Sequence, residues 1–171
     1  SKSWSWVRVN GLARRDKQRR PVMLVGVWVN ITRRKTAELR AAEDRDLFHT
    51  LIEHIPDSIY FKNRESRFVL ANTATANKLG VPTPADLTGR TDDYFFDQTM
   101  SDISRKEEMD IMVTGRPIRA RLHHETWLHK DDSWSQISKF PWYGRNGELK
   151  GIVGISSDVT KLVKTEIKAD R

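Results

Sequence analysis

Histidine and cysteine are the side chains that most often bind metals or act as bases and nucleophiles, and this sequence restricts both. It contains no cysteine, which excludes disulfide bonds, thiolate metal sites and cysteine nucleophiles. Among its five histidines, His49 and His54 lie five residues apart, so on a helix their side chains diverge by about 140° and cannot share a metal ion. His123 and His124 are adjacent in a segment with strand character, so one faces inward and one outward. These patterns predict no metal site.

The neighbouring carboxylates Asp92 and Asp93 are the best candidates for acid–base chemistry. Adjacent side chains of an extended segment point apart, so the two carboxylates do not converge on one substrate. They precede the aromatic run Tyr94–Phe96, and a turn or capping role is the simpler interpretation. The sequence also has no glycine-rich phosphate loop and no locally supported Ser-His-Asp arrangement. We therefore expect no catalytic residue in this chain.

Basic residues dominate the charge, with 30 Lys+Arg against 23 Asp+Glu and a net charge of +7. Such an excess is typical of proteins that bind nucleic acids. Here it lies wholly in residues 1–46, whereas residues 47–171 are balanced. A polar turn and a solvated helix start explain the basic clusters more simply than a DNA footprint does. The sequence therefore predicts no nucleic-acid partner.

Hydropathy indicates no membrane-spanning segment, because no apolar run approaches the required length. No signal-peptide pattern opens the sequence. We expect a cytoplasmic location, within a parent protein that could be anchored to a membrane elsewhere.

The strongest feature of organisation is an internal repeat at an offset of 128 residues, which needs no gap. Each copy reads as a strand, a polar turn, a second apolar strand and a helix. A short side chain caps each helix, Asn30 or Thr32 in the first copy and Asp158 or Thr160 in the second. The first copy is thus the end of one module, and residues from about 45 onward form a complete module. The matching segments are 5–6, 24–27, 30–33 and 38–41 with 133–134, 152–155, 158–161 and 166–169.

The complete copy alternates short strands and helices. A helical pattern over 32–55 stops at Pro56, and Asn72 is placed to cap a further helix over 73–79. The element order is β-β-α-α-α-β-β-β, which predicts an α+β fold with a five-stranded antiparallel sheet, helices packed on one face and flanking helices at both ends. The expected strands are 58–62, 67–71, 117–128, 134–140 and 152–155, and the expected long helix is 100–114.

Several motifs accompany this order: Asn72 after the second strand, the Gly89–Phe96 segment, Thr114–Pro117 before a strand, Trp134, and Gly151–Gly154 running into Asp158-Val159-Thr160. Together they resemble PAS domains with their C-terminal PAC region. The resemblance divides the chain into a closing hairpin of a truncated preceding PAS domain (1–32), a linker helix (33–46), a complete PAS domain (47–160) and the start of an output helix (161–171). In the first copy, Asn30 replaces the usual Asp of the Asp-x-Thr motif.

The resemblance implies a sensory and dimerisation module of a multidomain bacterial signal-transduction protein, of the sensor histidine kinase or diguanylate cyclase type. Such a module relays a ligand- or partner-induced change through its flanking helices to a covalently linked output domain. Signal coupling is expected at Asn30, Thr32, Asp158 and Thr160. The implied pocket between sheet and helices has as candidates Phe61, Phe95, Met109, Met112, Leu122, Trp134 and Ile137.

Within this family, the missing cysteine excludes flavin–cysteine photochemistry, and residues 98–114 contain no histidine to ligate haem. We expect no cofactor. The alternative is a flavin-binding redox-sensing PAS domain, in which Trp134 would contact the flavin, although a structural role for this Trp is favoured.

Exposed apolar surface predicts self-association. Trp4, Trp6 and Trp28 belong to a hairpin that lacks the elements to cover it. The helix after Thr32 carries a partial 3.5-residue apolar stripe. We expect a homodimer formed through the N-terminal segment and the linker helix.

Overall fold

The structure is a computed structural model that describes residues 4–169. Residues 1–3 and 170–171, at the ends of the predicted segments 1–32 and 161–171, lie outside the described residues. The chain divides into two units, Ser1–Thr50 and Leu51–Arg171. Helix α1 (Thr32–His54) begins in the first unit, and its last turn belongs to the second.

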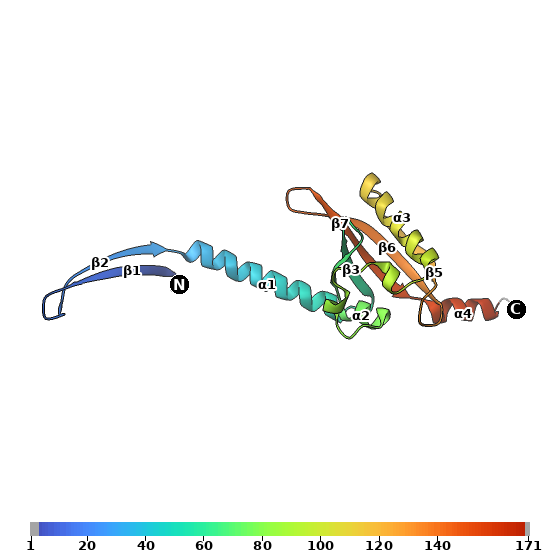
Figure 1. Cartoon of the computed structure of the whole chain (residues 1–171), viewed down its shortest axis with the longest axis horizontal. Helices are drawn as coiled ribbons and strands as arrows, with labels where there is room; N and C mark the ends of the chain where they lie inside the picture. The colour runs from blue at the N-terminus through green and yellow to red at the C-terminus, as the bar shows by residue number, and fades with distance from the viewer. Residues whose placement is uncertain (1–3, 170–171) are drawn as a thin grey trace. The chain divides into compact units, whose positions relative to one another are not determined.

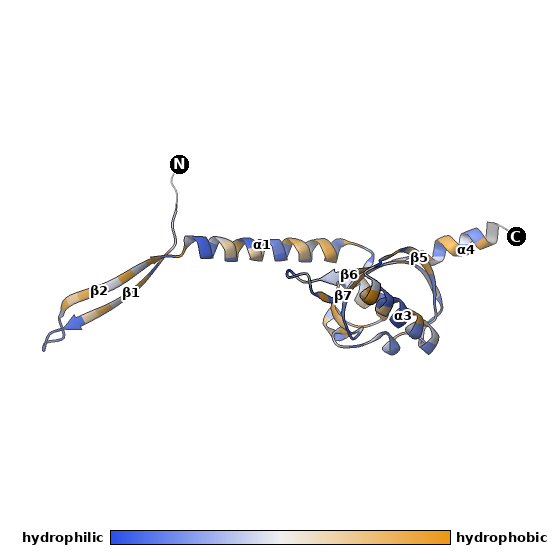
Figure 2. Ribbon diagram, turned by 90° about the horizontal axis from the view of Figure 1, so that it is seen from above, coloured by the Kyte–Doolittle hydropathy of each residue, from blue (hydrophilic) through white to orange (hydrophobic). Residues whose placement is uncertain are grey.

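The first unit is a β-hairpin followed by most of α1. Strands β1 (Val7–Arg15) and β2 (Pro21–Asn30) pair antiparallel. In the turn, the Asp16 amide donates to the Arg20 carbonyl (2.9 Å), and the Asp16 carboxylate accepts from the Arg20 amide (2.8 Å). Every residue of both strands is exposed. Figure 2 shows that apolar residues run along both strands while the turn is polar, so this unit does not bury its own strand faces.

The second unit contains a five-stranded antiparallel sheet with the strand order β4-β3-β7-β6-β5. Figure 1 shows α3 along one face of this sheet. The α+β fold expected from the sequence is confirmed. The strands are β3 (Ser58–Asn63), β4 (Phe68–Ala71), β5 (Ile118–Glu125), β6 (Ser133–Tyr143) and β7 (Leu149–Asp158).

Short helical segments follow β4. Helix α2 (Thr73–Leu79) begins where the Asn72 side chain accepts from the Thr75 amide, and it ends at Gly80, whose φ of 73° lies in the left-handed region. Two 3₁₀ helices come next, η1 (Pro84–Leu87) and η2 (Asp92–Tyr94).

The long helix α3 (Gln98–Thr114) starts two residues before the predicted Met100, because the Asp97 carboxylate caps it by accepting from the Met100 amide (2.8 Å). Helix α4 (Thr160–Ala169) follows β7 directly. Among the described helices, none combines the length and apolar character needed to cross a bilayer.

The core lies between the inner sheet face and the helical side of the second unit. Leu87, Ile111 and Ile152 are almost fully buried. The ring of Phe68 meets Tyr60 and Phe95 edge-on, at centroid distances of 5.7 and 6.2 Å. Each such pair adds about 0.5–1.5 kcal/mol beyond simple burial. This aromatic cluster fixes the position of Tyr60, which also borders the cavity described next.

Candidate functional site

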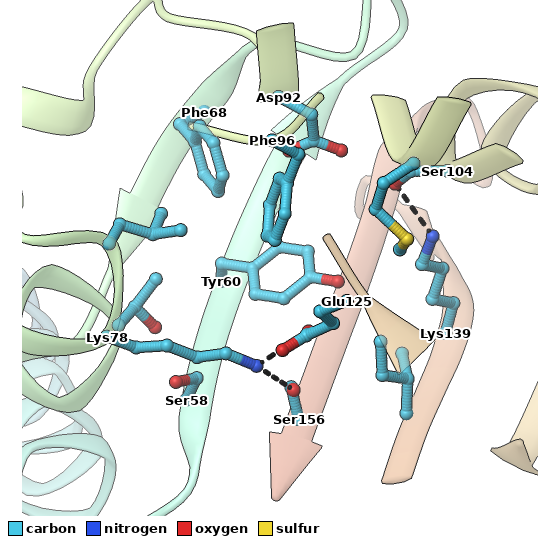
Figure 3. A pocket seen from close by; sticks show the side chains of 14 residues that line it. Ser58, Tyr60, Phe68, Lys78, Asp92, Phe96, Ser104, Glu125, Lys139 and Ser156 are labelled. Atoms are coloured by element: carbon cyan, nitrogen blue, oxygen red, sulfur yellow. Dashed lines mark hydrogen bonds and ion pairs between the residues drawn. The ribbon is translucent and has the colours of Figure 1, made fainter. Parts of the chain in front are cut away.

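A small cavity lies between the inner sheet face and the segments α2, η2 and α3 (Figure 3). Its volume is about 40 Å³, which is room for about three water molecules. Aromatic, hydroxyl and charged side chains share its wall, so it suits a small molecule with both polar groups and apolar surface. The lining residues are Ser58, Tyr60, Phe68, Thr75, Lys78, Leu79, Asp92, Phe96, Met100, Ser104, Glu125, Ile137, Lys139 and Ser156.

On the strands, most of the predicted pocket residues lie on the sheet face opposite to the residues that line the cavity. Tyr60 and Lys62 face inward on β3, so Phe61 faces the opposite side, where its ring meets Trp142 at 5.4 Å. On β5 the buried residues are His123 and Glu125, and Leu122 is 50% exposed. Successive strand side chains alternate between faces. The assignment of Phe61 and Leu122 to the cavity is therefore corrected.

Strand β6 gives one agreement and one correction. Ile137 is buried and lines the cavity, as expected. Trp134 lies three positions before Ile137, so its side chain faces the opposite side of the sheet and does not line the cavity. Its ring stacks on His124 instead, with a centroid distance of 4.7 Å. This contact supports the structural role that was favoured for Trp134.

The helix-side candidates are corrected as well. Met109 is 56% exposed, Met112 packs against the core, and Phe95 is buried within the aromatic cluster, all away from the cavity wall. Helix α3 turns a mixed stripe inward, which includes Met100 and Ser104. That stripe contains polar residues, which the apolar candidates Met109 and Met112 did not include.

One polar side of the cavity is formed around Lys78 of α2. Its Nζ donates to Glu125 Oε1 (2.8 Å), Ser135 Oγ (2.8 Å) and Ser156 Oγ (2.7 Å). The second carboxylate oxygen of Glu125 accepts from Ser133 and Ser135. Lys78 therefore ties α2 to β5, β6 and β7 at once, and all three of its donors are used. Figure 3 shows the bonds to Glu125 and Ser156.

A second buried lysine, Lys62 of β3, bridges two carboxylates. Its Nζ lies 2.7 Å from Asp92 Oδ2 and 2.6 Å from Glu108 Oε1. The side chains of Lys62 and Glu108 are each only 1% exposed. Although burial lowers the pKa of Lys62, the charges of Asp92 and Glu108 raise it above its usual value, so the lysine is charged. Asp93 points away and binds Arg105 (3.2 Å), as expected for adjacent residues.

A third lysine, Lys139 of β6, reaches α3. It donates to Ser104 Oγ (3.0 Å) and to Glu107 Oε2 (3.1 Å). Glu107 Oε1 lies 3.1 Å from Nε2 of the buried His123. Burial raises the pKa of Glu107, but the hydrogen bond from His123 and the charge of Lys139 outweigh it and lower that pKa to about 2. Charged contacts thus clamp α3 to β3, β5 and β6.

One buried polar atom beside this network, Glu108 Oε2, has no hydrogen-bond partner among the described residues. The hydroxyl of Tyr60 lies next to the cavity, as Figure 3 shows. Burial, reinforced by the charges of Glu108 and Asp92, raises the pKa of Tyr60 well above 10, so its hydroxyl is neutral and can donate. Tyr60 thus presents a neutral hydroxyl donor at the cavity wall.

The sequence analysis did not predict the buried charges, since lysine is seldom buried unless it is paired. A usable signal was present, because Lys139 continues the inward alternation Ser135–Ile137. Ser104 and Glu108 likewise lie one turn apart on the stripe that contains Met100. Within residues 4–169, no group of three or more His, Asp or Glu side chains is arranged to hold a metal ion.

The last strand joins α4 through a compact set of hydrogen bonds. The Thr160 amide donates to Asp158 Oδ1 (2.8 Å), and Thr160 Oγ1 accepts from the Trp134 amide (2.8 Å). The Val159 amide donates to the Trp134 carbonyl (2.8 Å). Burial raises the pKa of Asp158, but the bonds from Thr160 outweigh it and the pKa is lowered. Both predicted residues, Asp158 and Thr160, thus connect the helix start to β6.

The first copy contains the same joint. The Thr32 amide donates to Asn30 Oδ1 (2.9 Å), and Thr32 Oγ1 accepts from the Trp6 amide (2.8 Å). The amide of Ile31 donates to the Trp6 carbonyl (2.9 Å). Asn30 replaces Asp158 without loss of the hydrogen bond, since a side-chain carbonyl accepts as a carboxylate does.

Comparisons with known proteins agree with this geometry. A sequence model described as the PAS fold matches residues 52–164. A diguanylate cyclase of Vibrio cholerae is 28% identical over 132 residues, which cover 74% of this chain and 40% of that protein. The methanogenesis regulatory histidine kinase FilI of Methanothrix harundinacea is 23% identical over 121 residues, covering 71% of this chain and 13% of the kinase. The chain therefore spans less than half the length of these curated relatives.

Among solved structures, the VqmA dimer of Vibrio cholerae has the same fold, with a TM-score of 0.60 and 22% identity over 71% of this chain and 52% of VqmA. VqmA is a LuxR-type receptor with a target DNA, and it has been solved as a ligand–DNA complex. The expectation of no nucleic-acid partner, which rested on the balanced charge of residues 47–171, was wrong. A balanced charge on residues 47–171 does not exclude such a partner, because this fold occurs in a DNA-binding protein.

Proposed function

Because the chain belongs to the PAS-fold family, we propose that its second unit is a sensory module that binds a small molecule in the cavity beside Tyr60 and relays the binding to α4. The supporting observation is the position of Lys78. Its partners Ser135 and Ser156 lie on the two strands that hold the α4 joint. Ser135 follows Trp134 in sequence and pairs with Asp158 across the sheet. A ligand that displaces Lys78 acts within one residue of that joint.

The cavity also limits the ligand. A volume of about 40 Å³ is far below the several hundred Å³ typical of drug-sized pockets. We therefore propose a ligand of a few heavy atoms, or one small ring for which side chains move aside, with an acceptor for the Tyr60 hydroxyl. The three fused rings of a flavin exceed this space, so the geometry favours the small-molecule sensor over the flavin alternative.

The output is proposed by analogy with the relatives. A diguanylate cyclase and a histidine kinase both contain a region like this chain, and a DNA-binding receptor shares its fold. In each case a module of this kind can act on a separate output domain, because a two-state helix arrangement can be biased by what occupies the cavity.

The test uses two substitutions that add the same bulk at different places. Ile137→Trp fills the cavity from β6, whereas Leu122→Trp adds a ring at an exposed position on β5. A library of polar fragments of up to about ten heavy atoms is screened by ligand-observed NMR against the wild-type chain. We expect hits that the Leu122→Trp variant still binds and the Ile137→Trp variant does not. Hits that bind both variants equally, or no hits at all, would contradict the proposal.

A further inference from the structure

The β1–β2 hairpin reproduces the β6–β7 pair residue for residue, although it shares no sheet with it. At an offset of 128 residues, every cross-strand pair from Val7↔Asn30 to Arg14↔Met23 has its counterpart from Ser135↔Asp158 to Trp142↔Gly151. The register shift also falls at the same place, before Arg15 and before Tyr143. The two joints to the following helices are the same as well, as described above.

The turn is conserved in shape even where its sequence is unfavourable. Arg19 adopts φ 63°, and its counterpart Gly147 adopts φ 78°. A non-glycine residue in this left-handed region costs about 1–2 kcal/mol. The hydrogen bonds match too, since the Asp16 amide donates to the Arg20 carbonyl (2.9 Å) and the Gly144 amide to the Glu148 carbonyl (2.8 Å). The hairpin therefore keeps the turn geometry of the β6–β7 pair although Arg19, a non-glycine residue, occupies the left-handed position.

The surroundings of the two pairs differ completely. The outer edge of β7 pairs with β3, and the outer edge of β6 pairs with β5. The outer edges of β1 and β2, in contrast, are unpaired within the described residues. The hairpin face that corresponds to the core-facing side of β6 and β7 carries the pairs Val9↔Trp28 and Ala13↔Leu24. It bears no charge, and Trp28 is 73% exposed. A lone two-stranded hairpin is only marginally stable in water, and an exposed apolar face of this kind is typical of a contact surface.

Gly26 indicates which strand is absent from the sheet of the first unit. Its counterpart Gly154 must be glycine, because a Cβ there would lie 2.2 Å from the ring of Tyr60 on the neighbouring strand β3. At Gly26 a Cβ would meet nothing closer than the Asn10 carbonyl at 3.4 Å. Nothing within the first unit therefore requires glycine at this position, whereas an aromatic side chain from an added strand would.

We propose that β1 and β2 are the closing strands of a second PAS domain, whose other strands and helices are encoded before residue 7 in the same polypeptide. A β3-like strand from that segment pairs with the free edge of β2 and lays an aromatic ring on Gly26. The pairing runs from Trp28 to Leu24 and stops before Met23. The counterpart of Met23 is Gly151, where a Cβ would collide with the Lys62 carbonyl, so the strand cannot continue past that point unchanged.

Two glycine substitutions test this in the full natural polypeptide, including every residue encoded upstream. Gly26→Ala should lower the melting temperature of the upstream domain, because its Cβ meets the proposed ring. Gly11→Ala is the matched control on the same face, since its counterpart Lys139 carries a side chain there without conflict. In the 171-residue chain alone, both substitutions should leave melting unchanged. Equal effects of the two variants in the full polypeptide would overturn the proposal.

Hydrogen exchange on unsubstituted protein provides a test that does not depend on a variant folding. Amides of β2 should exchange at least about 100-fold more slowly in the full polypeptide than in the 171-residue chain, because a paired edge opens only with its domain. Equal exchange in both, or an upstream sequence that lacks the strand and helix pattern of residues 58–125, would overturn the proposal. Concentration-dependent protection of β2 in the 171-residue chain would assign the face to a second copy and also overturn it.

Discussion

Lys62 offers the sharpest test of the buried charges. Replacement by Met keeps the volume and removes the cation that faces Asp92 and Glu108. Because both carboxylates stay in the interior without their partner, Lys62→Met should lower the free energy of unfolding of the second unit by about 3–5 kcal/mol. That is a large part of the 5–15 kcal/mol typical of a domain. Urea unfolding followed by circular dichroism measures the change.

Two companion variants separate charge from packing. The triple variant Lys62→Met, Asp92→Asn, Glu108→Gln removes all three charges and should recover most of the lost stability, because no uncompensated charge remains. Lys150→Met removes a lysine that pairs with Glu148 on the surface, with side chains 46% and 48% exposed, and should change stability by less than about 1 kcal/mol. A loss below about 1 kcal/mol for Lys62→Met would refute the account of a charged, buried lysine.

Three further outcomes follow from the same geometry. The pKa of Glu107 is about 2 in the folded chain against 4.5 ordinarily. Its contribution to the free energy of unfolding, about 2 kcal/mol after allowance for solvent screening, is therefore complete above pH 4.5 and is lost as pH falls towards 2. Urea unfolding of wild type and Glu107→Gln at several pH values should show that their difference in stability shrinks over that window. Asp158→Ala removes the acceptor of the Thr160 amide and should cost about 1 kcal/mol, with a larger relative loss in the signalling output of the full protein, whereas unaltered signalling would argue against the joint. Gly154→Ala forces its Cβ into the Tyr60 ring and should cost more than about 1 kcal/mol in urea unfolding, and a neutral result would contradict the reading of Gly26 as well.

Much of the fold followed from local signals in the sequence. Asn72 and Gly80 bound α2 as expected, because capping depends on a short side chain and on left-handed backbone, both of which are local. The repeat gave the correct pairing of β6 with β7. These features do not depend on knowing what lies across the core.

The cavity wall could not be obtained in the same way. Apolar residues occur on both faces of the strands, so the sequence alone does not distinguish Phe61 from Tyr60 as the residue that faces the cavity. Lys62 and Lys139 were not among the predicted pocket residues, and an isolated lysine is costly to bury. They are buried because Asp92, Glu107 and Glu108 come from η2 and α3, distant in sequence, and these partners are visible only in the folded chain.

The central claim, that the content of the cavity is relayed to α4, is tested most directly at the joint itself. Amide hydrogen exchange of Trp134, Val159 and Thr160, resolved by NMR, reports on the hydrogen bonds that hold the start of α4. The account predicts that Ile137→Trp, which fills the cavity, changes these three exchange rates by about fivefold or more, while Leu122→Trp leaves them as in wild type. Identical rates in wild type and in a folded Ile137→Trp variant would contradict it.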